Sequence, residues 1–537
     1  MGVTSPPENI PPDPASGPAG PRDRDAGRLG GTQNQPSGAD YRNIISGTSQ
    51  NVVGIAVAAV ATLTSNLLIS RTLGRDAFGV VTVVTQAAFV ASFATRAGMD
   101  MAVLRDVAVE VGVGRFDRIR VPVARAALIA AAVSTLVAAV TVALAAGVRA
   151  LFSIDGDVGR WVVQAGAAGL PFLALANVWL SATRGLKIMR YTLYVFWAGQ
   201  PVMWVVLMVL GWRFSETAWM AVAAYSLSWV LATFAAAYFW RRESRGWTPA
   251  PMEPGALGRL ARYAGPRAPA ALFSQLLFWT DLFVLTRYGT ADEIGVYSAA
   301  LRAGQVIVLF LTSVNLMFSP FVADLHNRGE IARLDTLFKT LTRWTVAATM
   351  PLFLLLAVVP DAALGIFGQG FGEGRSALLI LLAGQFVNVA TGSVGFVLIM
   401  VGRTGWDLTV YAGSLATSLG LAFWLCPRYG MTGAAIANAV TFAVANAARL
   451  FLVKRFVGIQ PYDRRYGRLL VPAAAAGLAM VGVRALMGAT GLAVLAATAV
   501  AGGATYLAAY LVAGLTPEER RGVGKLTGRL RAARAGR

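Results

Sequence analysis

The side chains that could do chemistry in this chain are charged residues inside hydrophobic stretches. Asp281 lies within LLFWTDLFVL and Arg302 within YSAALRAGQ. A charge near the middle of a membrane helix costs about 2.5 to 3.5 kcal/mol on insertion scales, so it needs a partner or a wet cavity. Counting along two adjacent helices places both residues about 10 Å below one surface. We expect a charge pair that Arg302 leaves to bind a phosphate, and a permanent structural ion pair is the alternative.

Two further pairs have a spacing that places their members on one helix face. Arg96 and Asp100 are four residues apart, and a surface ion pair is the default expectation for them. Arg96 and the distant Arg71 also offer guanidinium groups at two ends of one path, and guanidinium binds a diphosphate through planar, bidentate contacts. Gln385 and Asn388, three residues apart, could offer amides to sugar hydroxyls, although such amides also join neighbouring helices.

The composition excludes most catalytic and metal chemistry. One cysteine, Cys426, gives no disulfide framework and no CxxC zinc site, and one histidine, His326, gives no histidine cluster. We therefore expect no enzyme activity, no cofactor and no metal. The net charge of +20 would suggest a nucleic-acid partner for a soluble protein. However, 56% hydrophobic residues, 14% charged residues and a mean hydropathy of +0.59 indicate an integral membrane protein, for which no nucleic-acid partner is expected.

These residues must be positioned by transmembrane helices, each of which needs about 20 apolar residues to cross a core of about 30 Å. The sequence predicts an all-α, polytopic membrane protein of about 14 helices, arranged as two six-helix bundles plus two C-terminal helices. The expected spans are residues 48–70, 78–98, 124–147, 161–181, 193–211, 218–240, 268–287, 295–318, 344–366, 376–400, 407–426, 431–453, 469–488 and 491–514.

The distribution of basic residues predicts the orientation. Lys and Arg gather in the two tails and in every second loop, which by the positive-inside rule places both termini in the cytoplasm. The Pro-, Gly- and Arg-rich stretch after the sixth helix is expected to be a hinge between the bundles. The expected parts are a disordered cytoplasmic tail (1–43), an N-terminal bundle (44–240), a cytoplasmic linker (241–267), a C-terminal bundle (268–457), two additional helices (458–515) and a basic cytoplasmic tail (516–537).

A short motif occurs twice, at an offset of 216 residues. Arg71, Asp76, Phe78, Gly79 and Val80 follow the first predicted helix, and their counterparts after the seventh are Arg287, Asp292, Ile294, Gly295 and Val296. Both copies lie on the same side of the membrane, so two halves of equal orientation, related by an axis along the membrane normal, are expected. A chance likeness between glycine-containing turns is the alternative.

Five segments follow one another along the chain in a recognisable order. They are SRTLGRDAFGVV, RAGMDMAVLRDVA, FWTDLFVLTRYGTADEIGVYSAALRAGQ, FSPFVADLHNRGE and PRYGMTGAAIANAV. Together they resemble the bacterial oligosaccharide flippases, also called polysaccharide biosynthesis membrane proteins. That family belongs to the superfamily that includes the multidrug and toxin exporters and the lipid II flippase. The resemblance covers about residues 44–460.

What the resemblance implies is a flippase that moves undecaprenyl-diphosphate-linked sugars from the inner to the outer leaflet of the bacterial cytoplasmic membrane. It would work by alternating access, in the biosynthesis of cell-surface polysaccharide. Its partners would be the lipid-linked oligosaccharide, membrane lipids, and a polymerase and glycosyltransferases of the same pathway. The family has no invariant catalytic motif, so the candidate binding residues rest on the sequence alone: Arg302, Asp281, Arg96, Arg71, Gln385 and Asn388.

Two other functions stay open. A cation-coupled multidrug exporter of the same fold would need acidic residues in the core of the first bundle, and the first six predicted helices have no carboxylate at mid-membrane. A membrane glycan polymerase or transferase would need an acid or base in a substantial outer loop. The short predicted outer loops offer only Asp155, Asp157, Asp361 and Glu373.

Overall fold

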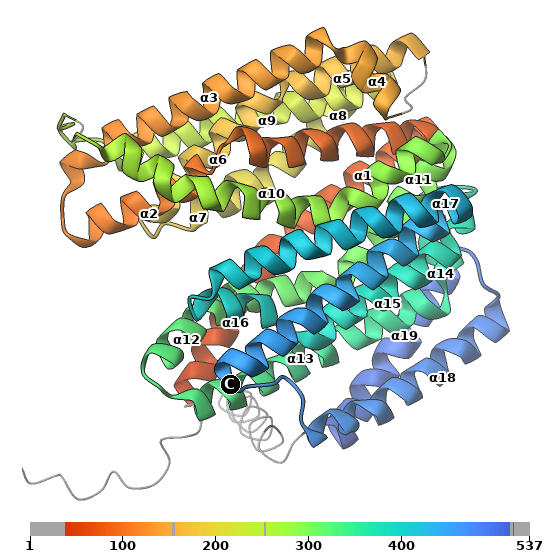
Figure 1. The fold of residues 1–537 in the computed structure, drawn as a ribbon. Coiled ribbons are helices and arrows are strands. Elements are labelled where there is room, and N and C mark those ends of the chain that lie inside the picture. The colour runs from red at the N-terminus through yellow and green to blue at the C-terminus, as the bar shows by residue number, and fades with distance from the viewer. Residues whose placement is uncertain (1–37, 153–155, 252–253, 516–518, 520–537) are drawn as a thin grey trace, which may run out of the picture.

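The computed structural model describes residues 38–152, 156–251, 254–515 and 519, and within that part it consists of helices joined by turns, with no β-strand (Figure 1). The predicted all-α, polytopic membrane class is confirmed, because twelve helices among the described residues are long and apolar enough to cross a membrane. The helices are α1 (Gly38–Thr95), α2 (Met99–Gly112), η1 (Phe116–Arg118), α3 (Arg120–Ala143), α4 (Ala145–Leu151), α5 (Gly156–Ala168), α6 (Leu170–Gly185), α7 (Arg190–Thr192), η2 (Leu193–Gly199), α8 (Gln200–Trp212), α9 (Ala218–Glu243), α10 (Ala256–Tyr288), α11 (Ala291–Gln305), η3 (Val306–Val308), α12 (Leu309–Asn327), α13 (Ile331–Val358), α14 (Pro360–Gly365), η4 (Phe371–Gly374), α15 (Arg375–Thr391), α16 (Val394–Met400), α17 (Thr404–Val457), η5 (Arg464–Leu469), α18 (Leu470–Met487), α19 (Leu492–Ala509) and η6 (Tyr510–Gly514).

Two of the helices each contain a bend at a glycine. Gly74 in α1 has φ 84° and Gly430 in α17 has φ 50°, a conformation that costs glycine little. Their membrane-spanning stretches have 39 and 53 residues, about 58 and 80 Å, against a membrane core of about 30 Å. The chain turns back at each bend (Figure 1). Dividing both stretches there gives the predicted fourteen segments, and the number of membrane crossings stays a prediction.

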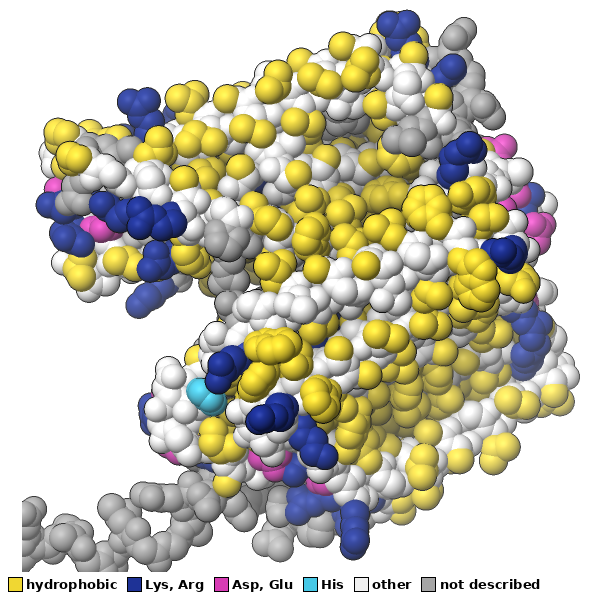
Figure 2. Space-filling model, viewed as in Figure 1, with side chains coloured by type: hydrophobic (Ala, Val, Ile, Leu, Met, Phe, Trp, Pro, Cys, Tyr) yellow, Lys and Arg dark blue, Asp and Glu magenta, His cyan; other side chains and the backbone are white. Residues whose placement is uncertain are grey.

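The helices form two lobes with a notch between them. Helices α2 to α9 lie in the first lobe and α11 to α17 in the second, while α1 and α10 contact both (Figure 1). Figure 2 shows the notch opening at one end of the molecule. We call the end where the notch opens the notch face, and the opposite end, where the lobes meet, the closed face. Helix α1 begins and α17 ends at the notch face, and the bends inside α1 and α17 lie at the closed face.

Several expected boundaries are wrong. Helix α1 begins at Gly38, inside the predicted tail, and the eighth span continues through η3 and α12 to Asn327. The tenth span is broken between α15 and α16, because Gly392 has φ 65° and the backbone turns there. The remainder of the predicted N-terminal tail, residues 1–37, and all of the predicted C-terminal tail except residue 519 lie outside the described residues.

The predicted hinge after the sixth helix is partly attached to the first lobe and partly helical. Trp247 packs against Phe116 and Trp240, with ring centroids 5.2 and 6.1 Å away, and its carbonyl accepts a 3.0 Å hydrogen bond from Arg120. Helix α10 then begins at Ala256, within the stretch expected to be a linker. The sequence signal was Pro and Gly content, which does not reveal that a tryptophan anchors the segment.

Candidate functional site

The two copies of the repeated motif meet at the closed face. A Cβ placed on Gly79 would lie 2.8 Å from the carbonyl oxygen of Ala291 and from the backbone nitrogen of Gly295. A Cβ on Gly295 would overlap the carbonyl oxygen of Arg75 and lie 2.7 Å from its carbonyl carbon. Position 291 follows Arg75 by the repeat offset of 216, so the approach of each glycine to the carbonyl oxygen four positions before the other glycine is mirrored. This reciprocity is what a twofold relation between the halves produces. We call the close approach of the two glycines the glycine crossing.

Two arginines on either side of the α1 bend hold the second lobe at this face. The Arg75 guanidinium lies 2.6 Å from the Asp292 carboxylate and 3.1 Å from that of Glu373, and it donates to the carbonyl of Gly370 at 3.2 Å. Arg71 Nε donates to the carbonyl of Ile366 at 2.8 Å. Polar contacts therefore cover the glycine crossing. Arg71, predicted as a phosphate ligand, lies in this closure.

A hydrophobic layer lies beneath these arginines. Phe78 is fully buried, and its ring centroid is 5.9 Å from that of Phe367 and 6.1 Å from that of Phe371. Phe78 belongs to the first copy of the motif, whereas both partners belong to the segment between α14 and α15. The closed face is therefore sealed by backbone, ionic and aromatic contacts together.

Arg302 lies between the lobes, in the last turn of α11. Its guanidinium carbon is 5.0 Å from the centroid of the Trp279 ring of α10, and its Nε has no hydrogen-bond partner in the described part of the chain. Tyr225 of α9, in the first lobe, is close enough to interact with it electrostatically. A guanidinium over an aromatic ring, with a donor left over, can still bind an anion.

The expected ion pair between Asp281 and Arg302 does not form. Asp281 is fully buried, and its Oδ2 accepts a hydrogen bond from Tyr297 instead. The depth estimate was wrong because α11 begins at Ala291, four residues before the expected start. Arg302 is therefore about 16 Å along α11, while Asp281 is about 10 Å from the end of α10 at Tyr288. The binding roles of Asp281 and Arg302 stay predictions.

The pair of Arg96 and Asp100 is confirmed, at 2.9 Å, but it is not a surface pair. Both side chains are buried, and the helix is broken between them, where Ala97 and Gly98 have φ 49° and 71°. Arg96 also donates to the carbonyl of Ser92 at 2.9 Å. The pair therefore connects the end of α1 to the start of α2, and its carboxylate already neutralises the guanidinium.

Gln385 and Asn388 share a face as predicted, but they bind each other and a third amide. Asn388 donates to Gln385 at 3.4 Å and accepts from Asn446 at 3.3 Å, and Thr391 donates to Asn446 at 3.2 Å. These contacts satisfy side chains beside the helix break at Gly392. In this conformation Gln385 is buried, so neither the predicted role of lining a cavity nor sugar binding is supported by its surroundings.

Sequence reasoning missed several residues that the structure brings to these regions. Trp279 and Tyr225 carried no pattern that linked them to Arg302. Arg75 could have been noticed, because it stands four residues after Arg71 and before the repeated glycine. Trp204 and Trp229 are buried around Tyr225, with centroids 5.1 and 6.3 Å from it.

No metal site is evident in the part of the chain that the structure describes, since no three His, Cys, Asp or Glu side chains are grouped to hold an ion. Asp281 and the carboxylates of the closed face each have organic partners. The arrangement offers cation–π contacts, amide networks and ion pairs, which suit binding and conformational change.

A protein-family model described as "Polysaccharide biosynthesis protein" matches residues 44–326 of this chain. A curated protein of Haloferax volcanii, "Probable low-salt glycan biosynthesis flippase Agl15", is 23% identical over 215 residues. That alignment covers 40% of this chain and 46% of the relative, so the chain spans about half the length of the curated protein that it matches.

Two solved structures share the fold. "Lipid II flippase MurJ, inward closed conformation" superposes with a TM-score of 0.67 at 13% identity, covering 86% of this chain and 98% of that one. An inward-facing multidrug resistance MATE family transporter of the MOP superfamily gives 0.64 at 13% identity, covering 76% and 98%. At this identity the likeness concerns the fold alone.

Proposed function

We propose, on the premise that this chain belongs to the polysaccharide biosynthesis protein family, that it is a flippase for lipid-linked oligosaccharides. The substrate would be an undecaprenyl-diphosphate-linked sugar, moved from the inner to the outer leaflet of a bacterial cytoplasmic membrane. The curated relative, which is named as a probable glycan biosynthesis flippase, supports this class of substrate. Both termini would be cytoplasmic, so the notch face would be the inner face.

The two-lobed shape supports alternating access. The notch is open at one face, while the glycine crossing and the Arg75 contacts close the other. A carrier of this kind exposes its site to one side at a time, and the lobes must therefore separate at the closed face during each cycle. The two bundles predicted from the sequence, 44–240 and 268–457, would be the moving parts.

Arg302 carries the proposal. A diphosphate crossing a membrane loses its hydration, and fixed positive charge must replace that water. Arg302 lies over the Trp279 ring and is close enough to Tyr225 of the first lobe to interact with it electrostatically. Among the described residues it has no carboxylate partner, and its Nε has no hydrogen-bond partner. Arg96, whose charge Asp100 neutralises, is the weaker of the two candidates.

The test compares Arg302→Gln and Arg302→Lys with the native protein. Translocation of an undecaprenyl-diphosphate-linked oligosaccharide is measured in vesicles that contain the purified protein, and thermal unfolding is measured in detergent. We expect Arg302→Gln to lose at least tenfold in rate and to unfold at nearly the native temperature. Arg302→Lys should keep part of the rate, because it keeps the charge but not the planar donors.

The control is Arg428→Gln. Arg428 is an exposed arginine at the closed face that donates to the carbonyl of Trp424 in its own helix, at 2.6 Å. Its loss should leave translocation unchanged. Native rates in Arg302→Gln would contradict the proposed role of Arg302, and absence of translocation by the native protein would contradict the flippase.

The fold likeness to a multidrug resistance transporter keeps drug export as the second candidate. Among the described helices of the first lobe, Asp100 is a buried carboxylate, and it already forms an ion pair with Arg96. Export would predict proton- or sodium-driven efflux of cationic drugs. Such efflux, together with inactivity toward lipid-linked sugars, would favour the exporter.

A further inference from the structure

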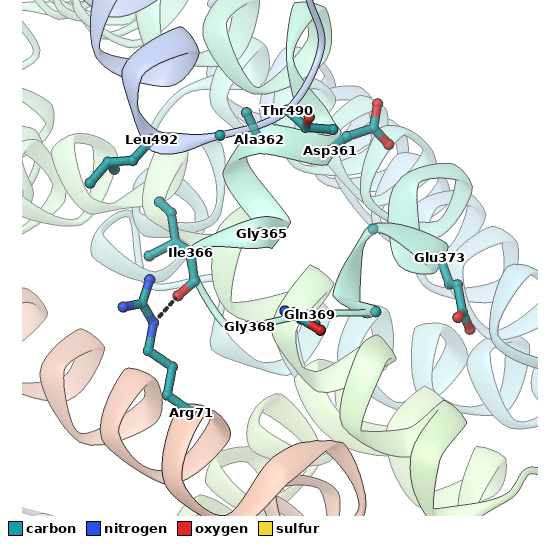
Figure 3. Close-up of a pocket in the computed structure, with 13 residues that line it drawn as sticks. Arg71, Asp361, Ala362, Gly365, Ile366, Gly368, Gln369, Glu373, Thr490 and Leu492 are labelled. Carbon is teal, nitrogen blue, oxygen red and sulfur yellow. Dashed lines mark hydrogen bonds between the residues drawn. The ribbon is translucent and has the colours of Figure 1, made fainter.

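A cavity of about 620 Å³ opens on the closed face, beside the two C-terminal helices (Figure 3). Its size is within the range of about 300 to 1,000 Å³ that small-molecule sites have. Three separate segments form it: the end of the first part of α1, the α14–α15 region and the turn between α18 and α19. They contribute Arg71, Asp361, Gln369, Glu373 and Thr490.

The wall of this cavity is rich in hydrogen-bonding groups. Arg71 uses its Nε for the carbonyl of Ile366, and its two terminal nitrogens lie on the other side of the guanidinium from that carbonyl (Figure 3). The Gln369 amide and the Thr490 hydroxyl can each donate and accept. Five glycines supply much of the remaining wall, and the carbonyls of Gly365 and Gly370 already accept hydrogen bonds.

The carboxylates of the cavity wall are already paired. The ion pairs in or next to its wall join Asp361 with Arg375 at 3.4 Å and Glu373 with Arg75 at 3.1 Å. Each carboxylate of the wall therefore already has an arginine partner, and Arg71 Nε is occupied by the carbonyl of Ile366. A free cation would have to compete with an arginine for either carboxylate, and a free anion would meet two carboxylates beside Arg71. A neutral molecule with many hydroxyls finds both donors and acceptors.

We infer that this cavity binds a neutral saccharide, and that its occupation holds the closed face shut. A ligand that contacts Arg71 and Gln369 together connects α1 to the second lobe across the closure. Because the cavity is formed from segments that the closure brings together, its ligand binds this arrangement in preference to the open one and shifts the population toward it.

The inference rests on the proposed function for its role in the cycle. With the closed face outward, sugar groups that accumulate outside would favour the inward-open state, which is ready for the next substrate. The saccharide binding itself needs no transport, so the two ideas can fail separately.

The first experiment measures binding of maltotriose and of N,N′,N″-triacetylchitotriose to the full chain in lipid nanodiscs, by calorimetry up to 50 mM. Inorganic phosphate and calcium chloride are the charged probes. The variant is Gln369→Leu combined with Thr490→Val, because neither side chain takes part in the hydrogen bonds and ion pairs described above for the closure. We expect millimolar binding of at least one saccharide, and at least tenfold weaker binding by the double variant.

The second experiment follows the closure with spin labels at Phe214→Cys and Tyr429→Cys, in a Cys426→Ala background. Both positions are exposed. Phe214 lies in the connection between α8 and α9 of the first lobe, and Tyr429 lies next to the bend of α17 in the second. The saccharide should increase the fraction of molecules with a short distance between the labels in the native protein. It should leave the distance distribution of the double variant unchanged.

Several results would overturn the inference: no saccharide binding at 50 mM, equal binding by the double variant, tighter binding of phosphate or calcium, or a saccharide-induced increase in the label distance. Arg302→Gln should bind the saccharide as the native protein does. If translocation fails while that binding persists, only the proposed function is contradicted.

Discussion

The two copies of the repeated motif agree in backbone and differ in side chains. Gly79 and Gly295 cross so closely that each faces the main chain of the other copy, in mirrored contacts. Four residues before each glycine the copies differ, because the first has Arg75 and the second Ala291. Only the arginine reaches across to Asp292 and Glu373. The glycines, which both copies share, thus set where the lobes meet. Arg75, which only the first copy has, sets how firmly the lobes are held together.

The copies differ again further along the chain. Thr95 ends α1 and the backbone breaks at Ala97 and Gly98, whereas the positions 216 residues later, 313 and 314, lie inside the uninterrupted helix α12. Arg96 and Asp100 connect the two sides of the break. The position equivalent to Arg96 is Thr312, so the second half has no such pair. A shared backbone plan therefore supports different polar groups in each half.

The largest effect should come from adding a side chain at the crossing. Gly295→Ala places a Cβ against the main chain of Arg75, which cannot rotate away, and overpacking of this kind costs about 1 to 3 kcal/mol. We expect a lower unfolding temperature in detergent and a longer distance between labels at positions 214 and 429. Gly420→Ala, where a Cβ meets nothing within 4 Å, is the matched control. Equal behaviour of the two variants would mean that the crossing is not tightly packed.

A smaller effect is expected from Arg75→Ala, which removes the asymmetric contact and keeps the glycine crossing. The population open at the closed face should rise, as reported by the same label pair, while the unfolding temperature should change little because Arg75 is partly exposed. Arg428→Ala provides the comparison for loss of an arginine at that face. An unchanged distance distribution would assign the closure to the glycines and aromatic rings alone.

Double-mutant cycles should separate the pair that forms from the pair that does not. Arg96→Gln and Asp100→Asn should couple by about 1 to 3 kcal/mol in stability, because the two side chains form a buried ion pair. Arg302→Gln and Asp281→Asn should be additive within about 0.5 kcal/mol, since each has other partners. Denaturant or thermal unfolding of the four single and two double variants supplies the values. Strong coupling between Arg302 and Asp281 would mean that the ion pair expected from the sequence does form.

The smallest effect concerns the helix break itself. Ala97 has φ 49°, a left-handed conformation that costs a residue with a Cβ about 1 to 2 kcal/mol, so Ala97→Gly should stabilise the protein by up to about 1 kcal/mol. Ser313→Gly, at the equivalent position within a regular helix, should destabilise it instead. Changes of the same sign in both variants would argue against a strained break in the first half.

The sequence predicted the features that hydrophobic length determines. Long apolar stretches indicated the helices, and the repeated glycine indicated two related halves whose contact at Gly79 and Gly295 the structure then supplied. The resemblance to polysaccharide biosynthesis proteins is confirmed by the family match over residues 44–326. The two domains and the functional roles of the site residues stay predictions.

Side-chain partners were predicted less well, for a physical reason. Spacing within one helix is fixed by its geometry, so Arg96 and Asp100 were paired correctly, and Gln385 and Asn388 were placed on one face. Partners on different helices depend on where each helix begins, and a shift of four residues moves a side chain by about 6 Å. That shift is why Asp281 binds Tyr297 and Arg302 lies over Trp279.

The mirrored glycine contact has a consequence for the ancestry of such chains. A half-length chain with one copy of the motif could make the same contact with a second copy of itself, because the surface around the glycine is its own complement. In that homodimer, position 75 would be arginine in both subunits or in neither. A single chain that holds both copies can carry an arginine in one copy and an alanine in the other, so that Arg75 of the first copy alone holds the closure.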